Sequence, residues 1–381
     1  MASRRRILFS GYAPVHFVCF LEVYRRLLAD PDVEVWLSGG FKHEQEDGRV
    51  WFTIDGFYDP FDVDKERVIP IERARDESFD VLVCAHLSDS LFPGKVEKTV
   101  QIYHGVSFKN LAVRDRALRF DLLCLPGRYH AELYQRAGLV RPGAAKCLLT
   151  GFAKTDALVT RQGVTDVVRA LGLDPSRPTL LFAPTGEKHN ALEVAGHAIV
   201  RAIRDDGRFN LLVKPHDHPK LKIDWFAELA SLEGDRVRLV RDKDVVPYLV
   251  AADLLITDAS SVALEYTLLD RPILFVDVPR LLQKVSTKAP ALDLETYGRR
   301  IGRVVAGHED VVGAIDDALV HPQREAAIRR QAAAHLFHRP GGATERVTGV
   351  IRHAAGLGPL PDDVEVVEPL AERDPREGDA A

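Results

Sequence analysis

Residues 253–275 read DLLITDASSVALEYTLLDRPILF, and this stretch decides the fold class. An apolar run ends at Thr257-Asp258, two serines and an amphipathic stretch follow, and a second apolar run begins at Ile273. Short apolar runs predict buried strands, and the spacing between them predicts a helix beginning near Ser261. A strand, a helix and a strand in this order are typical of a βαβ unit with parallel strands.

The same alternation extends over most of the chain and occurs in two series. The strands predicted in the first series are residues 5–11, 33–40, 79–86, 98–105, 121–127 and 146–152, with helices near 17–29 and 128–137. The strands predicted in the second series are residues 179–186, 209–216, 237–242, 253–260, 272–278 and 302–307, with helices near 191–205, 244–251, 261–269 and 309–319. Two consecutive doubly wound parallel sheets predict an α/β protein with two Rossmann-like domains that face a cleft.

The predicted domain limits follow from these series and from the composition of the C-terminus. We assign residues 1–160 to an N-terminal Rossmann-like domain and residues 161–355 to a C-terminal one, because the pattern then restarts. A chain of 381 residues is long enough for two cores of ordinary size. Residues 356–381 are acidic, contain proline and have little apolar periodicity, so we expect a disordered tail.

The composition argues against several classes of protein. The formal net charge of −5 is small for this length, so a general surface for nucleic acid is not indicated. The four cysteines are far apart in apolar surroundings, which is typical of reduced, buried thiols in a cytoplasmic protein. We expect neither a signal peptide nor a transmembrane helix, because no apolar run is long enough. The basic residues Arg4, Arg5 and Arg6 leave a peripheral contact with the inner face of the cell membrane open.

Polar residues recur at the predicted carboxyl ends of the strands, where open parallel sheets bind ligands. In the second series these residues are Thr185, Lys214, His216, Asp258, Ser260 and Ser261. In the first series they are Gly11, His16, His86 and His104. The two groups are expected to lie on opposite sides of the predicted cleft.

The helix start at Ser260-Ser261 has two interpretations. A serine hydroxyl can cap a helix N-terminus, and it can also donate to a phosphate bound there. Glu265 lies one position too late for a reciprocal capping box with Ser261. A carboxylate at that place would either be solvated or accept hydrogen bonds from ribose or polyol hydroxyls. The stretch is therefore compatible with a capped helix and with a site for a phosphorylated or nucleotide-linked polyol.

Three further segments also have a functional and a structural interpretation. Lys214 and His216, separated by a proline, could clamp a diphosphate or form a surface turn. His104, followed by Gly105, could be a general base with room for substrate, or a histidine hydrogen-bonded in a turn. Residues 337–351 contain two glycines before a helical pattern and could form an anion-binding helix start or an ordinary loop and cap.

Signatures of several other chemistries are missing from the sequence. It contains no HExxH, GxSxG or GxxxxGK[ST] motif and no Cys/His cluster with metal-ligand spacing. A serine triad, zinc chemistry and P-loop phosphoryl transfer are therefore not indicated, and no metal site is predicted.

Taken in order, the motifs resemble the CDP-glycerol glycerophosphotransferase family of teichoic-acid synthesis, which has the GT-B fold. The similar segments are Tyr103-His104-Gly105-Val106 with Lys109, Gly151-Phe152-Ala153-Lys154-Thr155-Asp156, Ala183-Pro184-Thr185, Lys214-Pro215-His216, Thr257-Asp258-Ala259-Ser260-Ser261 with Glu265, Asp270-Arg271-Pro272, and Gly341-Gly342-Ala343-Thr344-Glu345-Arg346-Val347. They run from about residue 98 to 350, roughly two-thirds of the chain. Residues 1–95 are similar only to a generic GT-B N-terminal domain.

The resemblance implies transfer of a polyol phosphate, with glycerol phosphate as first choice, from a CDP-linked donor to a hydroxyl of a cell-surface polymer or glycolipid. CMP would be released. The implied catalytic residues are His104, as the base, and His216. The implied donor-binding residues are Thr185, Lys214, Asp258, Ser260, Ser261 and Glu265, with Glu265 towards the ribose. Further contacts with donor or acceptor are implied for Gly11, His16, Gly105, Lys109 and Asp156. No cofactor besides the donor is implied, and a divalent metal is left unassigned.

The chain departs from the family pattern at several positions. Val106 replaces a threonine, Ser107-Phe108 replaces Pro-Leu, and Lys214 replaces an arginine. Ala259 replaces a tyrosine, and this last change is expected to open space near the donor. The transferred group could therefore be glycerol phosphate, ribitol phosphate or a sugar phosphate. Two other functions stay open: a GT-B glycosyltransferase or 2-epimerase acting on a UDP-sugar, and a nucleotide-binding protein without catalysis.

Overall fold

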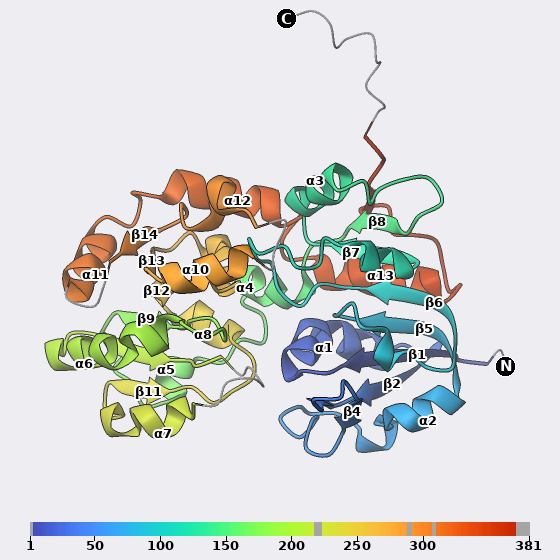
Figure 1. The fold of residues 1–381 in the computed structure, drawn as a ribbon, viewed down its shortest axis with the longest axis horizontal. Helices are drawn as coiled ribbons and strands as arrows, with labels where there is room; N and C mark the ends of the chain where they lie inside the picture. The colour runs from blue at the N-terminus through green and yellow to red at the C-terminus, as the bar shows by residue number, and fades with distance from the viewer. Residues whose placement is uncertain (1–2, 217–222, 288–291, 307–309, 371–381) are drawn as a thin grey trace, which may run out of the picture.

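The computed structural model describes residues 3–216, 223–287, 292–306 and 310–370. Within these residues the chain forms two α/β domains that lie side by side (Figure 1). One sheet has seven strands in the order β15-β8-β7-β6-β5-β1-β2, and the other has six in the order β11-β10-β9-β12-β13-β14. A separate hairpin is formed by β3 (Phe41–Glu44) and β4 (Val50–Thr53). The α/β class predicted from the alternating pattern is confirmed.

The N-terminal sheet is built from the strands predicted in the first series. They are β1 (Arg5–Gly11), β2 (Val33–Gly39), β5 (Ser78–Cys84), β6 (Lys95–Gln101), β7 (Leu122–Leu125) and β8 (Lys146–Leu149). The helices of this part are α1 (Pro14–Leu28), α2 (Ile71–Asp76) and α3 (Arg128–Arg136), and the turn η4 (Ala153–Thr155) with α4 (Asp156–Thr160) leads onward. The strand order reverses between β1 and β5, which is where such sheets place ligands.

The C-terminal sheet follows the second series. Its strands are β9 (Thr179–Phe182), β10 (Asn210–Val213), β11 (Val237–Leu239), β12 (Leu254–Thr257), β13 (Ile273–Val276) and β14 (Arg303–Val305). Its helices are α5 (Val167–Ala170), α6 (His197–Asp206), α7 (Trp225–Leu229), α8 (Val246–Ala251), α9 (Val262–Tyr266), α10 (Pro279–Ser286), α11 (Val311–Val320) and α12 (Ala326–Leu336). Every residue of β9, β10, β12 and β13 is buried, as expected for strands covered on both faces. The strand order reverses between β9 and β12.

The last helix of the described chain returns to the N-terminal domain. Helix α13 (Ala343–Ala354) packs on α1, β5 and β6, and Val347, Val350 and Ile351 are buried in the same apolar core as β1. The predicted second domain, residues 161–355, therefore differs from the structure, in which this helix belongs to the first core. An amphipathic pattern predicts a helix, but it carries no information on which sheet the helix will cover.

The segment after α13 has a defined course as far as residue 370, where the sequence predicts a disordered tail. Strand β15 (Glu365–Val366) pairs antiparallel with β8, and Val364 is buried. A strand of two residues leaves no periodic signal in the sequence, which explains why it was not predicted. The rest of the predicted tail, residues 371–381, lies outside the described residues.

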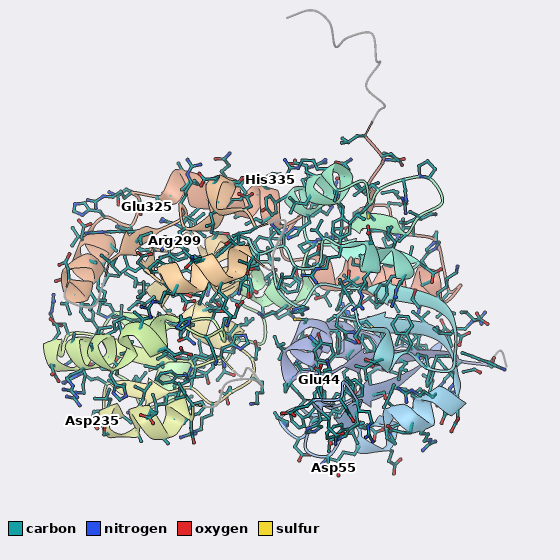
Figure 2. All side chains as sticks on the ribbon, viewed as in Figure 1. Glu44, Asp55, Asp235, Arg299, Glu325 and His335 are labelled. Carbon is teal, nitrogen blue, oxygen red and sulfur yellow. The ribbon has the colours of Figure 1, made fainter. Side chains whose placement is uncertain are left out.

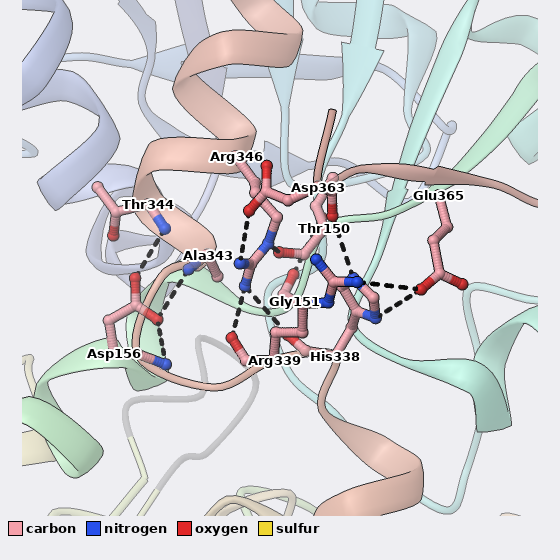
Figure 3. A network of polar contacts seen from close by, with 11 residues as sticks. Thr150, Gly151, Asp156, His338, Arg339, Ala343, Thr344, Arg346, Asp363 and Glu365 are labelled. Carbon is pink, nitrogen blue, oxygen red and sulfur yellow. Dashed lines mark hydrogen bonds and ion pairs between the residues drawn. The ribbon is translucent and has the colours of Figure 1, made fainter. Parts of the chain in front are cut away.

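The start of α13 is anchored by a carboxylate from the end of the N-terminal domain (Figure 3). Asp156 Oδ1 accepts hydrogen bonds from the backbone N–H groups of Gly341 at 3.1 Å and Ala343 at 3.0 Å, and Oδ2 accepts one from Thr344 at 2.7 Å. A helix N-terminus carries free N–H groups and a partial positive charge that a carboxylate neutralises. The anion bound at this helix start is therefore the Asp156 side chain of the same protein. Both oxygens of Asp156 accept hydrogen bonds here, and the donor or acceptor contact predicted for Asp156 stays a prediction.

Arg346, in α13, completes this anchor (Figure 3). Its Nε donates to the Thr150 carbonyl oxygen at 2.7 Å, and its terminal nitrogens donate to the carbonyl oxygens of His338 and Arg339 at 3.1 and 2.6 Å. It also pairs with Asp363 at 3.2 Å, and its side chain is only 6% exposed. One buried guanidinium therefore joins the end of β8, the loop before α13 and the C-terminal segment.

A second contact between the domains joins α3 to α12. His335 Nε2 lies 2.9 Å from Glu132 Oε1, and His335 Nδ1 lies 2.9 Å from the Tyr297 hydroxyl oxygen. Figure 2 labels His335 at the boundary between the two halves of the molecule. Together with α13, this contact helps to keep the two sheets in a defined relative position.

Two observations bear on the predicted membrane contact. No helix in the described part of the chain has the length and apolarity that a membrane span needs. Of the basic residues at the N-terminus, Arg5 pairs with Asp80 at 2.7 Å, and Arg6 pairs with Glu77 and lies 5.3 Å from the centre of the Trp36 ring. The chain itself neutralises these two charges, which weakens the reason for expecting a membrane contact at this end of β1.

We expect Asp156→Ala to destabilise the protein, because three backbone N–H groups at the start of α13 lose their acceptor. The expected loss in the free energy of unfolding is about 1–3 kcal/mol, the range for donors left without a partner. Urea denaturation followed by circular dichroism measures it. Asp166→Ala is the matched control: Asp166 caps α5 on the surface through one bond to Arg169 N at 3.2 Å, so its loss is expected to be smaller. Equal losses would contradict the anchoring role of Asp156.

Candidate active site

The carboxyl ends of the two sheets meet at the junction between the domains. Gly105, after β6, lies opposite Ser261, which precedes α9: a Cβ added to Gly105 would be 3.3 Å from Ser261 Oγ. Lys109 reaches across the same junction to the loop that contains Thr185. Residues predicted from separate series of strands are therefore neighbours, and they define the candidate site.

His104 is held with the proton on a known ring nitrogen. Its Nδ1 lies 2.6 Å from the Ala85 carbonyl oxygen, and a carbonyl only accepts, so Nδ1 donates. This leaves the Nε2 lone pair as the basic atom of the neutral ring. Burial within the surrounding protein and the charge of Lys154 lower the pKa of His104, although the bond to Ala85 opposes this. Part of the residue remains exposed, so a neutral base stays within reach of a ligand.

Two other predicted histidines surround His104 but are buried. The ring centres of His16 and His104 are 5.0 Å apart, and those of His16 and His86 are 5.5 Å apart. The Tyr12 N–H donates to His16 Nδ1 at 3.2 Å and the Ser88 N–H to His86 Nδ1 at 3.1 Å, so both rings carry the proton on Nε2. Burial, helped by the neighbouring imidazoles, lowers the pKa of His86 to about 3 and that of His16 well below its usual range. These rings stay neutral and support His104 by packing.

Gly11 provides room for His16 at the end of β1. A Cβ on Gly11 would lie 2.9 Å from His16 Cβ, and a Cβ on the neighbouring Gly39, with φ +107°, would overlap the Gly11 carbonyl oxygen at 1.9 Å. Close backbone packing therefore accounts for glycine at both positions. The donor or acceptor contact expected for Gly11 stays a prediction.

Asp258 organises the C-terminal side of the site. It follows β12 and accepts hydrogen bonds from the backbone N–H groups of Thr185 and Ala191, both at 2.8 Å. Its side chain is fully buried, and burial raises its pKa although the two N–H donors oppose this. Asp258 therefore holds the loop after β9, including the predicted donor residue Thr185. Because it has no exposed surface, the direct donor contact predicted for Asp258 is replaced by this supporting role.

Lys109 crosses from the N-terminal domain into the same loop. Its Nζ lies 2.8 Å from Glu187 Oε1 and 3.3 Å from Thr185 Oγ1, and its side chain is 11% exposed. The structure thus brings the predicted residues Lys109 and Thr185 together. Glu187 was not predicted, because a charged residue in a polar loop has no distinguishing sequence signal.

The start of α9 differs from a helix capped by the Ser261 side chain, one of the two interpretations of the sequence. Helix α9 is short and continues as a 3-10 turn, Thr267–Leu269, to Asp270 at φ +49°. Ser261 has helical dihedral angles, φ −61° and ψ −28°, and its side chain makes no capping hydrogen bond in the described structure. An N-cap hydroxyl normally needs an extended backbone to reach the helix N–H groups. Of the two interpretations of this helix start, the structure does not support a side-chain cap at Ser261, and the Ser261 hydroxyl lies near Gly105. Ser260, beside it, is 5% exposed.

Glu265 is neither solvated nor open to the site. Its carboxylate is fully buried, and Oε2 accepts a hydrogen bond from Lys154 Nζ at 2.8 Å. Burial raises the pKa of Glu265, against the attraction of Lys154. Burial alone would lower the pKa of Lys154, but the Glu265 carboxylate outweighs it and raises that pKa. Glu265, which was predicted to accept hydrogen bonds from ribose hydroxyls, forms an ion pair between the domains in this structure.

Lys214 and His216 follow β10. Lys214 is 8% exposed, and its Nζ donates to the Asp242 carbonyl oxygen at 2.6 Å. His216 is exposed and is the last described residue before the gap at 217–222. The structure therefore places Lys214 beside the loop after β11, and the catalytic role of His216 stays a prediction.

Asp244 is a partly buried acid near the site that was not predicted. Its Oδ1 accepts a hydrogen bond from the Val246 N–H at 2.9 Å. Burial raises the pKa of Asp244, whereas the charges of Lys154 and Lys214 lower it. An acid just before a predicted helix has the sequence signal of an ordinary cap, which explains why its place near two lysines could not be recognised.

The apolar departures from the family pattern lie in the core. Val106 and Ala259 are both fully buried, and Phe108 is 1% exposed. None of the three presents its side chain to a ligand in this structure. The open space expected near the donor at Ala259 is therefore filled by neighbouring core residues.

Two facing Rossmann-like domains with a polar junction between their strand ends define a protein of the GT-B class. The chain belongs to the CDP-Glycerol:Poly(glycerophosphate) glycerophosphotransferase family, whose model matches residues 64–353. The resemblance drawn from the motifs is thereby confirmed.

Curated relatives agree with this assignment. The chain is 27% identical over 225 residues to the teichoic acid glycerol-phosphate primase of Bacillus spizizenii, covering 58% of this chain and 53% of that protein. It is 25% identical over 194 residues to the teichoic acid glycerol-phosphate transferase of Staphylococcus aureus, covering 47% and 43%. The chain thus spans about half the length of the curated relatives it matches.

Solved structures share the fold at low sequence identity. The wall teichoic acid polymerase TagF has a TM-score of 0.63 at 14% identity, covering 92% of this chain and 89% of that chain. A variant of that polymerase soaked with CDPG has a TM-score of 0.65 at 14% identity, covering 93% and 89%. A putative UDP-N-acetylglucosamine 2-epimerase from Listeria monocytogenes has a TM-score of 0.60 at 14% identity, covering 95% and 99%. These likenesses confirm the predicted GT-B fold.

We expect nitrogen NMR of the imidazole rings to show the Nδ1–H tautomer for His104 and the Nε2–H tautomer for His16 and His86 at neutral pH. Their pKa values are lowered on folding, so the unfolded chain binds these protons more tightly. Stability is therefore expected to fall as the pH drops below about 6.5, the usual histidine pKa. Difference spectra with His104→Gln assign the signals. An Nε2–H tautomer for His104 would contradict its role as a base.

Proposed function

We propose that this chain transfers a polyol phosphate, with glycerol phosphate as first choice, from a CDP-linked donor to a hydroxyl acceptor and releases CMP. Membership of the glycerophosphotransferase family supports the reaction class. The observation that carries the proposal is the His104 ring: Nδ1–H is fixed on the Ala85 carbonyl at 2.6 Å, which leaves Nε2 as a base. It lies on the strand end that faces Ser261 of the other domain.

In this proposal His104 is the general base. Nε2 takes the proton of the acceptor hydroxyl while the hydroxyl oxygen forms a bond to the phosphorus that carries the polyol. The bond from that phosphorus to the bridging oxygen of the diphosphate breaks, and its electron pair leaves with CMP. The lowered pKa of His104 keeps the ring neutral near pH 7 and ready to accept the proton.

The donor diphosphate is proposed to lie on the C-terminal side of the junction. Hydroxyl groups and lysine charges are proposed to face it there, from Ser260, Ser261, Thr185, Lys109 and Lys214. Lys109 is paired with Glu187 in this structure, and Lys214 donates to the Asp242 carbonyl oxygen. The hydroxyl of Ser261 is not used for capping, which leaves it for a ligand. Fixed donors of this kind stabilise the charge that develops on the non-bridging and leaving oxygens. His216 is proposed as a second catalytic residue, as the resemblance implies.

The other functions left open by the sequence are less well supported. The likeness to a 2-epimerase is at 14% identity and concerns the fold alone, whereas the family match favours a CDP-linked donor. A nucleotide-binding protein without catalysis would have no reason to keep His104 neutral and partly exposed. Turnover measurements separate these functions directly.

The acceptor and the location belong to the same proposal. The family description names poly(glycerophosphate), which supports a polyol-phosphate polymer or a glycolipid carrying one as acceptor. We place the reaction in the cytoplasm, where the donor would be supplied. Contact with the membrane surface would have to use a region other than Arg5 and Arg6, because both are paired within the chain.

The purified protein is expected to release CMP from CDP-glycerol when a short glycerol-phosphate acceptor is present. His104→Gln should lower kcat by about 10²–10⁴, the usual contribution of a general base. Calorimetry should show that this variant still binds CDP. His321→Gln is the matched control, because this histidine lies half-exposed at the end of α11 beside Asp317, and the activity of this variant should persist.

The same assay with UDP-N-acetylglucosamine tests the first alternative. Release of UDP without release of CMP from CDP-glycerol would overturn the proposed donor. Binding of CDP by the unaltered protein with no turnover of any CDP-linked polyol would favour the non-catalytic protein.

Lys109→Met is expected to raise KM for the CDP-linked donor by about tenfold, as for the loss of one charged hydrogen bond. Glu187→Gln should lower KM, because the carboxylate now holds Lys109 Nζ at 2.8 Å and competes with phosphate. Initial rates at varied donor concentration measure both effects. Lys42→Met, in an exposed pair with Glu44 on the β3–β4 hairpin, should leave KM unchanged. An unchanged KM in Lys109→Met would show that Lys109 does not contact the donor.

A further inference from the structure

Lys154 and Glu265 form a buried ion pair that bridges the two domains. Lys154 lies in η4, directly after the N-terminal sheet, and Glu265 lies in α9 of the C-terminal domain. Nζ and Oε2 are 2.8 Å apart, and the side chains are 5% and 0% exposed. The other carboxylate oxygen, Oε1, is buried and has no hydrogen-bond partner within the described residues. The pair is therefore shielded from water, and Glu265 depends on Lys154 for its compensation.

Each partner of the pair is connected to the backbone next to His104 through one neighbouring element. Turn η4, which carries Lys154, packs on α1, and Cys19 of α1 donates through Sγ to the His104 carbonyl oxygen at 3.3 Å. Helix α9, which carries Glu265, follows Ser261, whose hydroxyl lies against Gly105. The ion pair therefore joins the two elements between which the His104-Gly105 segment is held.

We propose that Lys154 and Glu265 are positioning residues for His104: their pairing docks η4 against α9 and balances the charge next to the base. This inference rests on the proposed function, in which His104 takes up a proton during each turnover. A lone lysine would oppose formation of the imidazolium ion, whereas a paired lysine opposes it less. The unpaired carboxylate of Glu265 would act in the other direction.

The groups that face His104 allow the direction of the effect to be worked out. His16 on α1 and His86 after β5 are neutral, and the Cys19 thiol is kept protonated by burial, which raises its pKa to about 12. Lys154 is the charged group that acts on His104 directly. Glu265 and Asp244 act through Lys154, since both attract its ammonium group. The charge balance near the base is thus set mainly by whether Lys154 is paired.

The test is the dependence of kcat/KM on pH in three variants. Lys154→Met removes the positive charge, so the acid limb should move to higher pH by about 0.5–1 unit, within the range for a nearby charge. Glu265→Gln leaves Lys154 unbalanced, so the acid limb should move to lower pH. The double variant Lys154→Met with Glu265→Leu is neutral and should return towards the unaltered profile. Lys154→Arg should keep that profile.

A merely structural pair predicts a different result, namely a lower rate at every pH with no movement of the acid limb. Lys98→Met is the matched control, because Lys98 pairs with Asp121 at 3.3 Å on an exposed part of the same domain. Shifts of both single variants in the same direction, or no shift in either, would overturn the inference.

Failure of this inference can be distinguished from failure of the proposed function. If the unaltered protein releases no CMP, the function is wrong, whatever the variants do. If the unaltered protein releases CMP and requires His104, but the acid limbs of the Lys154→Met and Glu265→Gln profiles do not shift in opposite directions, only the positioning role is wrong. Titration of the His104 ring by NMR in the same variants gives the shift without any turnover. This titration also gives the pKa shift of His104 in a variant that folds but has no activity.

Discussion

Parallel strands place all their carboxyl ends at one edge of a sheet, and the molecule depends on keeping two such edges opposed. Each sheet supplies half of the candidate site: His104 follows β6 on one side, while Thr185 and Ser261 follow β9 and β12 on the other. The chain secures this arrangement by returning to its first core after completing the second. The carboxylate of Asp156 and the guanidinium of Arg346 fasten the returning helix α13 at its start. Without this return, only the segment around α4 and side-chain contacts would join the sheets.

Local periodicity was sufficient to predict most strands and helices, because burial of β9, β10, β12 and β13 on both faces requires continuous apolar runs. Local periodicity was not sufficient to predict which domain α13 packs on, because Val347, Val350 and Ile351 would give the same sequence pattern on either core. Strand β15 was missed for a related reason: two residues gain their structure from pairing with β8, not from their own pattern. Contacts between distant segments decide both features.

The candidate site shows the same division between local and distant information. The positions of Thr185, Ser261 and His104 follow from strand ends, which the sequence indicates. The contact partners of the site residues do not follow from the strand ends. Lys154 and Glu265 are 111 residues apart in the sequence, and a carboxylate one turn into a helix gives the same sequence pattern whether it binds a hydroxyl or a lysine. Family resemblance gave the reaction class, but it did not show that Asp156 binds a helix N-terminus or that Asp258 holds a loop.

The contacts that hold the fold together differ in chemistry from the ion pairs that lie across the candidate site. Helix α13 is joined to the first core by apolar side chains, which lose free energy when exposed to water. Two contacts across the site are ionic: Lys154 with Glu265, and Lys109 with Glu187. A buried ion pair gains little net stability, because the loss of hydration offsets the attraction, and both groups recover water when they separate. Separating these two pairs therefore costs less than exposing apolar contacts of the same area. Under the proposed transfer this is a requirement, because the end of a polymer must enter and CMP must leave at every turnover.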